Sequence, residues 1–292
     1  MSVWFDARVD RIQRAIDAVL PAGCSNRLYR SRCSTSHFFV VLSGSDREPG
    51  PYLMYDAERA ALQPIGGLRP WIDSATQGTR SFHRVAARDG LPNPVYLTHP
   101  PGASPSEPLP AVPLVHGGPY LRGSMLAWAV KQGGVDAGRV CMMGGSYGGY
   151  AALMAPISRP SVFRCAVAFA AVTDLHLMYS AEWSDLSEAA KRNSMPVLIG
   201  DPVKDEKRLN AASPLLRAAE IKVPVLLGHG EFDQHVLSAH WNQVLRAARE
   251  GGVAVLPELR RRTQESALRN SSPLLSNDWQ ELMRPRVEGS IS

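Results

Sequence analysis

Residues 143–150 read MGGSYGGY, and they lie between an apolar run at 139–143 and a helical pattern at 147–155. The G-x-S-x-G motif within them is typical of a serine placed on a sharp turn from a strand into a helix. Such a turn presses neighbouring backbone together, and Gly144 and Gly148 leave the room that side chains would fill. The helix N-terminus also favours negative charge that develops near Ser146. We therefore predict that Ser146 is a nucleophile; the alternative is a glycine-rich loop that only turns the chain.

A second glycine-rich stretch, HGGPY at 116–120, follows an apolar strand pattern at 111–115. A nucleophilic serine of this kind needs a second backbone N–H donor for the oxyanion, and a glycine-rich loop one or two strands earlier supplies it. We predict that this stretch is the oxyanion loop. His116 is expected to shape the loop rather than to act as general base, because the base follows the acid in the chain order of such sites.

Carboxylates follow the strand pattern at 223–227, in the stretch LGHGEFD at 227–233. Asp233 has the chain order and position expected of the acid that holds a catalytic imidazole by its Nδ1–H. Asp174 and Glu231 compete for this role, although Asp174 follows the strand directly after the predicted nucleophile, which is one strand too early. A solvated loop aspartate is the alternative for Asp233.

Strand and helix patterns alternate over the central part of the chain. The strand patterns lie at 111–115, 139–143, 165–172 and 223–227, and the helical patterns at 125–131 and 147–155. A further pair of strands is predicted at 82–86 and 95–98, around a turn at 88–90. This alternation predicts an α/β fold with a mostly parallel sheet.

The first eighty residues have a different pattern. Apolar residues at helical spacing predict a helix over 4–20, with Phe5, Val9, Ile12, Ile16 and Val19 on one face. Four short strands are predicted at 26–30, 37–42, 52–55 and 62–65. Strands of this number and length make about one blade of a β-propeller. We predict a helix and β-propeller remnant over 1–80, an α/β domain over 81–256, and a divergent tail over 257–292, to which the sequence pattern assigns no helix or strand.

Composition excludes several classes of protein. The net charge of +5 includes only five lysines, and the scattered arginines lack the stacking aromatics of a nucleic-acid surface. No apolar run approaches the roughly 18 residues that a membrane span needs, and charged residues interrupt any N-terminal export signal. The cysteines show no metal-like spacing, and Cys141 and Cys165 are predicted to be buried small hydrophobes. We expect a cytoplasmic protein with no cofactor, no metal, and no nucleic-acid or membrane partner.

Taken together, the motifs resemble the prolyl oligopeptidase family of serine peptidases, and most closely its dipeptidyl aminopeptidase and acylaminoacyl peptidase branch. The matching stretches are HGGPY at 116–120, GGSYGGYAALM at 144–154, VTDLHLMYSAEWSD at 172–185, IGDPVKDEKRLNAASPLLRA at 199–218 and IKVPVLLGHGEFD at 221–233. The resemblance is dense over 81–256 and looser towards the N-terminus, where the family carries a β-propeller. It implies an α/β-hydrolase fold, preceded here by a β-propeller fragment.

The resemblance also implies roles for individual residues. Ser146 would be the nucleophile, the backbone N–H groups of Tyr147 and Gly118 would form the oxyanion hole, and Asp233 would be the acid of the triad. Tyr179 and Trp183 fall in the stretch that helps to line the primary specificity pocket of the family, with ordinary core packing as the alternative. The family cleaves short peptides, so short peptides are the expected substrates.

One departure from the family concerns the general base. The family supplies this histidine roughly thirty residues beyond the acid, whereas none of the eight histidines in this sequence follows His240. His235 and His240 lie too close to Asp233 in the chain to reach across the sheet in the usual way, so no triad histidine is assigned. Loss of the base in a comparable triad costs about 10⁶ in turnover. We therefore expect weak peptidase activity or none.

A second departure is an internal gap. Between Pro119 and the predicted helix at 125–131 the family has another helix, strand and loop, whereas this sequence has only residues 120–124. The missing strand lies between the second and third strands of the usual sheet, so its loss leaves two edges with unpaired backbone groups or requires a re-pairing. We expect lower stability as a result.

Three functions are consistent with these observations. The first is a serine-type peptidase that works through an acyl-enzyme on Ser146, with impaired turnover. The second is a catalytically dead pseudoenzyme or degraded gene product that at most binds peptides. The third is an esterase of small acyl esters, which uses the same groups.

Overall fold

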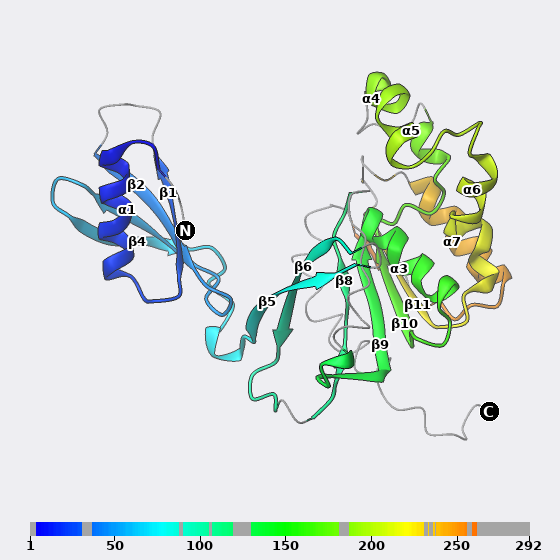
Figure 1. The fold of residues 1–292 in the computed structure, drawn as a ribbon, viewed down its shortest axis with the longest axis horizontal. Helices are drawn as coiled ribbons and strands as arrows, with labels where there is room; N and C mark the ends of the chain where they lie inside the picture. Colours follow the sequence, from blue (N-terminus) through cyan, green and yellow to red (C-terminus); the bar gives the residue numbers. More distant parts are fainter. Residues whose placement is uncertain are drawn as a thin grey trace. The chain divides into compact units, whose positions relative to one another are not determined.

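The computed structural model describes residues 4–30, 37–87, 90–104, 107–118, 130–180, 187–230, 233, 236, 238–255 and 259–261. Contacts divide the chain into two units, residues 1–104 and 105–292 (Figure 1). The predicted helix at 125–131 lies almost wholly outside the described residues, as does most of the tail after residue 256.

The first unit contains a helix and a four-stranded antiparallel sheet whose strands follow chain order. Helix α1 (Ala7–Val19) begins after Asp6, whose carboxylate accepts a hydrogen bond of 2.8 Å from the backbone N–H of Arg8. The strands are β1 (Ser25–Arg30), β2 (Phe38–Gly44), β3 (Pro51–Asp56) and β4 (Ala61–Gly67). The four strands predicted from the sequence are confirmed to within two residues at each end.

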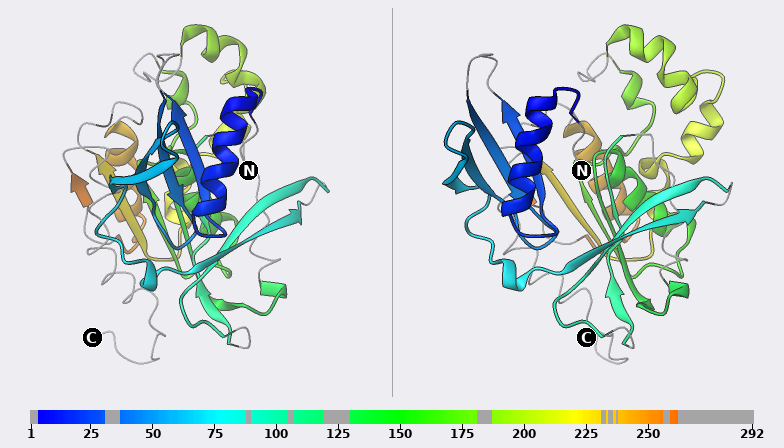
Figure 2. Two further views of the ribbon diagram at one scale, coloured as in Figure 1. Left: turned by 90° about the vertical axis from the view of Figure 1, so that its left-hand side faces the viewer. Right: turned by 60° about the vertical axis from the view of Figure 1, so that its left-hand side comes forward.

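Helix α1 covers one face of this sheet (Figure 2). The buried core of the unit consists of Val9, Ile12, Ile16, Leu28, Phe39, Val41 and Tyr55. Phe5 and Val19, which were also predicted for the buried face, are exposed. Phe5 precedes the first helical turn and Val19 is the last helical residue, so neither is held against the sheet.

A short 3₁₀ helix, η1 (Ser74–Thr76), follows this sheet in the chain. The predicted hairpin is formed by β5 (Thr79–Ala86) and β6 (Pro92–His99), which pair antiparallel as a separate two-stranded sheet.

The second unit contains a mostly parallel sheet in the order β12-β11-β10-β9-β7, with β8 also paired to β9. Its strands are β7 (Leu109–Ala111), β8 (Leu114–Val115), β9 (Val135–Gly145), β10 (Cys165–Phe169), β11 (Val225–Gly230) and β12 (Leu259–Arg261). The single strand predicted at 111–115 is divided into β7 and β8, because Pro113 between them has no N–H to donate to the sheet. The predicted α/β arrangement is confirmed.

Helices α3 (Tyr147–Ser158) and α7 (Ser238–Glu250) pack on the same face of this sheet. Ala152 and Leu153 of α3 and Trp241 and Val244 of α7 share a core cluster with alternate residues of β10 and β11. The intervening residues Val167, Phe169 and Leu226 point to the opposite face, as the two-residue period of a strand requires. The smaller helices are η2 (Leu177–Tyr179), α4 (Glu188–Asn193), α5 (Met195–Leu198), α6 (Glu206–Ala211) and η3 (Pro214–Glu220).

The order of the strands bears on the predicted internal gap. In the part of the chain that is described, β7 and β8 form one end of the parallel sheet, and β5 and β6 pair only with each other. The described residues therefore place no strand on the outer side of β7 and β8. Across the same residues, no helix is both long and apolar enough to cross a membrane.

The two buried cysteines differ from the prediction. Cys141 of β9 and Cys165 of β10 are opposite each other in the parallel register, and they form a disulfide with 4.7 Å between their Cα atoms. Both are fully buried, as predicted, but they are bonded rather than free. The sequence could not indicate this pairing because it depends on the register between two strands that are 24 residues apart.

We expect the disulfide to be detectable in the purified protein. Alkylation under denaturing, non-reducing conditions should leave the peptides containing Cys141 and Cys165 unmodified and joined, as measured by mass spectrometry. Since the bond closes a loop of 24 residues, its reduction should lower the free energy of unfolding by about 3 kcal/mol. Recovery of both cysteines as separately alkylated peptides before reduction would contradict the assignment.

Candidate active site

Ser146 lies at the junction between β9 and α3 with an unusual backbone conformation. Its φ is 58° and its ψ is −124°, a region that residues with side chains rarely occupy. Its N–H donates to the carbonyl of Phe169 at 2.9 Å, and its carbonyl accepts from the N–H of Tyr150 at 3.1 Å and of Val172 at 3.3 Å. Backbone partners on both sides therefore hold the conformation, while the residue itself is exposed.

The glycines around Ser146 are required by close backbone approach. A Cβ on Gly144 would overlap the backbone of Gly148, and a Cβ on Gly148 would overlap the carbonyl of Val115 in β8. A Cβ on Gly149 would lie 2.7 Å from the Cβ of Ala171. The steric reason for the glycines of the motif, predicted from the sequence, is thus visible in the structure.

The glycine-rich stretch 116–118 lies directly beside Ser146. Val115 pairs with Gly144 in the parallel register, and a Cβ on Gly117 would lie 3.3 Å from Ser146 Cβ and 3.7 Å from its Oγ. Gly118 has a φ of 98°, and His116 Nδ1 lies 2.6 Å from the carbonyl oxygen of Gly117. His116 thus contacts its own loop, in keeping with its predicted part in shaping it.

The backbone N–H groups predicted for the oxyanion hole belong to Tyr147, at the start of α3, and to Gly118, in the glycine-rich stretch beside Ser146. Tyr147 is the first residue of α3, where a backbone N–H has no acceptor within the helix. Pro119 and Tyr120 of the predicted loop lie outside the described residues.

Asp233 lies three residues after β11 and is 8% exposed. Its N–H donates to the carbonyl of Gly230 at 3.1 Å, and its Oδ1 accepts from the N–H of Val236 at 3.1 Å. Because β9, β10 and β11 are parallel neighbours, Ser146 and Asp233 follow the same edge of the sheet with β10 between them. The structure therefore brings both predicted residues to one end of the sheet.

The two competing carboxylates are placed differently. Asp174 Oδ1 accepts from the N–H of His176 at 2.9 Å and from Ser213 Oγ at 3.3 Å, so it connects the loop after β10 to the segment that follows α6. Glu231 lies outside the described residues.

His240 is completely buried at the start of α7. Its Nδ1 accepts a hydrogen bond of 3.0 Å from the N–H of Thr173, and the Thr173 hydroxyl donates to its carbonyl at 3.0 Å. Burial lowers the pKa of His240 to about 4; nearby His229 lowers it further, and Asp174 opposes the shift. His240 therefore stays neutral at neutral pH and fastens α7 to the loop after β10.

Two further histidines lie close to Asp233 in the sequence. His229 is buried and stacks on Trp241 with 6.0 Å between ring centroids, and His235 lies outside the described residues. Among the residues that the structure describes, none hydrogen-bonds Ser146 Oγ. The described residues also contain no group of three histidine, cysteine or acidic side chains that could hold a metal ion.

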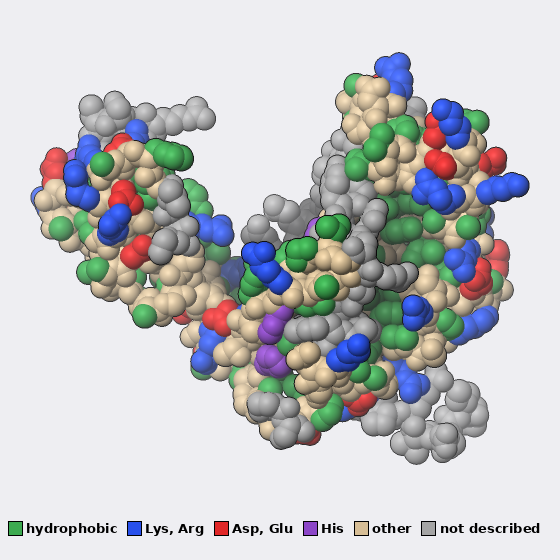
Figure 3. Space-filling view, viewed as in Figure 1, with side chains coloured by type: hydrophobic (Ala, Val, Ile, Leu, Met, Phe, Trp, Pro, Cys, Tyr) green, Lys and Arg blue, Asp and Glu red, His purple; other side chains and the backbone are tan. Residues whose placement is uncertain are grey.

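An apolar cluster includes Tyr147, which follows Ser146, and Val236, whose N–H donates to Asp233. Its buried members are Val172, Leu175, Met178, Met195, Ile199, Leu209 and Val236, with Tyr147, Tyr150, Ala170, Tyr179 and Ala212 packed against them. Figure 3 shows hydrophobic side chains in a hollow between α3 and the helices α4 to α6. The predicted pocket residue Tyr179 belongs to this cluster, whereas Trp183 lies outside the described residues.

Two members of the cluster were not predicted from the sequence. Tyr150 packs against Tyr147 with 4.7 Å between ring centroids and the rings tilted by 40°, and burial raises the pKa of Tyr150 to about 12. Val236 packs in the cluster while its N–H holds Asp233. Spacing could have indicated both, because Tyr150 is three residues from Tyr147 on a helix and Val236 is three residues beyond the acid.

We predict that Gly148→Ala disrupts the site. The new methyl group would overlap backbone atoms of β8, which cannot move without breaking the pairing with β9. The free energy of unfolding should fall by about 3 kcal/mol or more, as measured by urea denaturation. Gly134→Ala is the matched control, since its methyl group would meet nothing within 4 Å. Equal stability of the two variants would refute the steric account.

We also predict a pH-dependent contribution of His240 to stability. Because the pKa is about 4 in the folded protein and 6.5 in the unfolded chain, the unfolded state binds more protons between these values. Above pH 6.5 the contribution of His240 to the free energy of unfolding is complete. It declines as the pH falls, and at pH 4 it is lower by about 3 kcal/mol than at neutral pH.

The measurement is urea denaturation at pH 7 and pH 4 for the wild type and for His240→Asn, whose amide oxygen can accept from Thr173 at either pH. The loss of stability between the two pH values should be smaller in the variant by about 3 kcal/mol. An unchanged difference would show that His240 titrates normally.

Comparison with known proteins gives the relatives of this chain. Residues 124–264 match the profile of the Prolyl oligopeptidase family. Dipeptidyl aminopeptidase BIII of Pseudoxanthomonas mexicana is 28% identical over 74% of this chain and 40% of its own length. Dipeptidyl peptidase family member 6 of Caenorhabditis elegans is 24% identical, over 80% of this chain and 41% of its own length. The chain thus spans less than half of the length of these relatives.

Solved structures share the fold. A puromycin hydrolase superposes with a TM-score of 0.69 at 20% identity, over 92% of this chain and 48% of that one. The acylaminoacyl peptidase of Pyrococcus horikoshii gives a TM-score of 0.69 at 14% identity, over 94% of this chain and 52% of that one. The resemblance drawn from the motifs is therefore confirmed for residues 124–264, which match the prolyl oligopeptidase family, and dipeptidyl aminopeptidases are similar to the chain in sequence. The solved structures show that the chain shares the fold of a puromycin hydrolase and of an acylaminoacyl peptidase.

Proposed function

We propose that this chain is a serine-type peptidase that hydrolyses short peptides through an acyl-enzyme on Ser146. The observation that carries the proposal is the backbone of Ser146, which is held at a φ of 58° on the turn from β9 into α3 and leaves the residue exposed beside the glycines at 117 and 118. A conformation of this kind costs about 1–3 kcal/mol, and such strain is concentrated at functional sites.

The proposed mechanism assigns a step to each group. Ser146 Oγ attacks the peptide carbonyl carbon, and the N–H groups of Tyr147 and Gly118 stabilise the negative oxygen of the tetrahedral intermediate. The C–N bond then breaks as the leaving amine takes up the proton that the Ser146 hydroxyl has given up. Water next hydrolyses the acyl-enzyme, with its OH joining the acyl carbon and its remaining proton returning to Ser146 Oγ. Asp233, held by the N–H of Val236, would orient a protonated base. We propose that turnover is impaired, because His240 is committed to Thr173 and no histidine follows it in the sequence.

The second candidate is a pseudoenzyme that binds peptides without turnover. The buried, neutral His240 and the lack of a described partner for Ser146 Oγ favour it. In this case the apolar cluster beside Ser146 would still bind an apolar side chain.

Further expectations belong to the same proposal. An esterase would use the same groups, and a comparison of p-nitrophenyl esters with peptide anilides distinguishes it from a peptidase.

The four-stranded sheet β1–β4 is proposed to be the remnant of a β-propeller blade, because each of its strands is short and joins the next antiparallel. We propose a cytoplasmic location. The disulfide between Cys141 and Cys165 tests this proposal, because disulfides are rare in the cytoplasm.

Covalent labelling with a fluorophosphonate tests the proposed function. The wild-type protein should be labelled slowly at Ser146, and Ser146→Ala should not be labelled, as measured by intact-mass and peptide spectrometry. If labelling occurs, His235→Gln should slow it and His240→Asn should not, because His240 is buried against Thr173.

Circular dichroism and urea denaturation provide the control for folding. A folded wild-type protein that remains unlabelled would reject the peptidase and support the second candidate. Saturable binding of a short peptide to that unlabelled protein would then identify it as a peptide-binding pseudoenzyme.

A further inference from the structure

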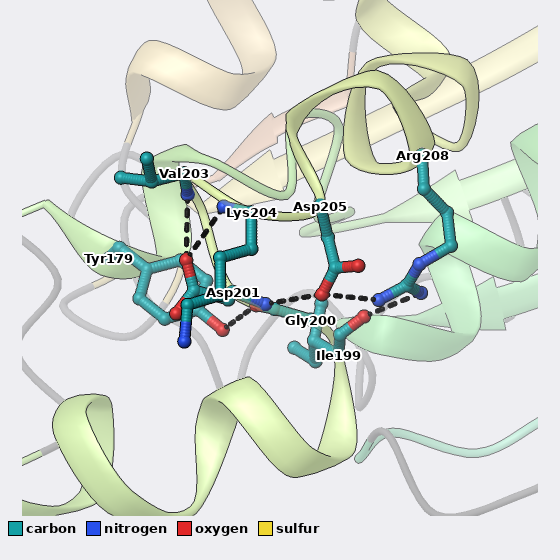
Figure 4. Close-up of polar contacts among 8 residues, drawn as sticks. All are labelled: Tyr179, Ile199, Gly200, Asp201, Val203, Lys204, Asp205 and Arg208. Carbon is teal, nitrogen blue, oxygen red and sulfur yellow. Dashed lines mark hydrogen bonds and ion pairs between the residues drawn. The ribbon is translucent and has the colours of Figure 1, made fainter.

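The segment 199–209 packs against the apolar cluster beside Ser146. Ile199 and Leu209 are buried members of the cluster, so both ends of the segment are anchored in it. Between them, Gly200, Asp201 and Asp205 form a compact loop (Figure 4). Asp201 Oδ1 accepts from the N–H groups of Val203 and Lys204, each at 2.9 Å, and Asp205 Oδ2 accepts from the N–H of Asp201 at 2.8 Å.

Arg208 connects the two ends of this loop. Its Nη1 donates to the carbonyl of Ile199 at 2.9 Å, and its Nη2 lies 3.1 Å from Asp205 Oδ2. The guanidinium lies so close to Gly200, whose φ is 139°, that a Cβ there would overlap it. Position 200 therefore requires glycine both for its backbone conformation and for the space that Arg208 occupies.

Tyr179 is fixed by the same loop. Its hydroxyl donates to the carbonyl of Gly200, and its ring packs against the apolar cluster. Burial raises the pKa of the Tyr179 phenol, and Asp201 raises it further, so the hydroxyl remains a neutral donor. The chain of contacts thus runs from Arg208 through Gly200 to the ring of Tyr179.

Arg208 also acts at a distance on the tyrosines next to the nucleophile. Its positive charge opposes the rise in pKa that burial causes for Tyr147 and Tyr150. Tyr147 directly follows Ser146, so the guanidinium lies within electrostatic reach of the residue that supplies an oxyanion-hole N–H. Arg217, by contrast, contacts only Glu220 and the carbonyl of Ala211 among the described residues.

We propose that Arg208 is a positioning residue that fixes the ring of Tyr179, through Gly200, and thereby selects substrates with a large apolar side chain beside Ser146. This inference rests on the proposed function, because it takes the half-buried tyrosines at the edge of the apolar cluster, Tyr147, Tyr150 and Tyr179, as the surface that contacts the substrate. Loss of the guanidinium frees the Gly200 carbonyl to move, and the ring of Tyr179 moves with it. Displacement by about 1 Å is enough to change reactivity severalfold or more.

The test compares two phosphonate probes that modify Ser146, one with an ethyl group and one with a benzyl group. The ratio of their second-order labelling rates, benzyl to ethyl, should fall at least about tenfold in Arg208→Ala and in Tyr179→Phe. The double variant should show no further fall, because both changes break one chain of contacts. Arg208→Lys should recover part of the ratio, and Arg217→Ala should leave it unchanged.

A merely structural role gives a different result. If Arg208→Ala slows both probes equally, or leaves the ratio unchanged in a folded protein, the proposal is overturned. Absence of labelling by the ethyl probe in the wild type would reject the proposed function instead, and a binding measurement then decides this inference.

The binding measurement uses calorimetry with the Ser146→Ala protein and a dipeptide that ends in phenylalanine. Affinity should fall about tenfold when Arg208→Ala is added and should be unaffected by Arg217→Ala. Equal affinity with and without Arg208, or no binding in either protein, overturns the proposal.

Discussion

The structure of the second unit depends on the close approach of two backbones, where the α-carbon of Gly148 lies against the carbonyl of Val115. This contact joins the start of α3 to β8, and the pairing of Val115 with Gly144 joins β8 to β9. Ser146 lies between these contacts and has no freedom to relax to a negative φ. The strained serine is therefore a consequence of how one helix and two strands meet, and not of its own side chain.

The rest of the site extends from this junction through apolar packing. Tyr147 and Tyr150, in the first turn of α3, pack against the cluster that also contains Tyr179 and Val236. Since Val236 is both buried there and bonded to Asp233, one cluster positions Asp233 and the residue that follows Ser146. The buried His240 strengthens the same region by fastening α7 to Thr173, which explains why it stabilises the fold and is unsuited to accept a proton.

Most of the fold and the position of Ser146 on a turn from a strand into a helix could be predicted from the sequence, because strands, turns and the G-x-S-x-G motif are local patterns. Contacts between residues far apart in the sequence could not be predicted in this way. The Cys141–Cys165 disulfide, for example, depends on the register in which β9 pairs with β10. Gln13 is another example, since its buried amide donates to the carbonyl of Asn26, a residue 13 positions away, besides its bonds to Trp4 and Asp17. The link from Arg208 through Gly200 to Tyr179 joins residues up to 29 positions apart and has no local signature.

The central claim is that the backbone at Ser146 presents an activated oxygen to two N–H groups. A crystal structure of the protein after reaction with a fluorophosphonate tests this directly. The account predicts a bond from Ser146 Oγ to phosphorus, with the phosphonyl oxygen roughly 3 Å from the nitrogens of Tyr147 and Gly118. An unmodified Ser146 with a negative φ, or an adduct whose phosphonyl oxygen points away from both nitrogens, would contradict it.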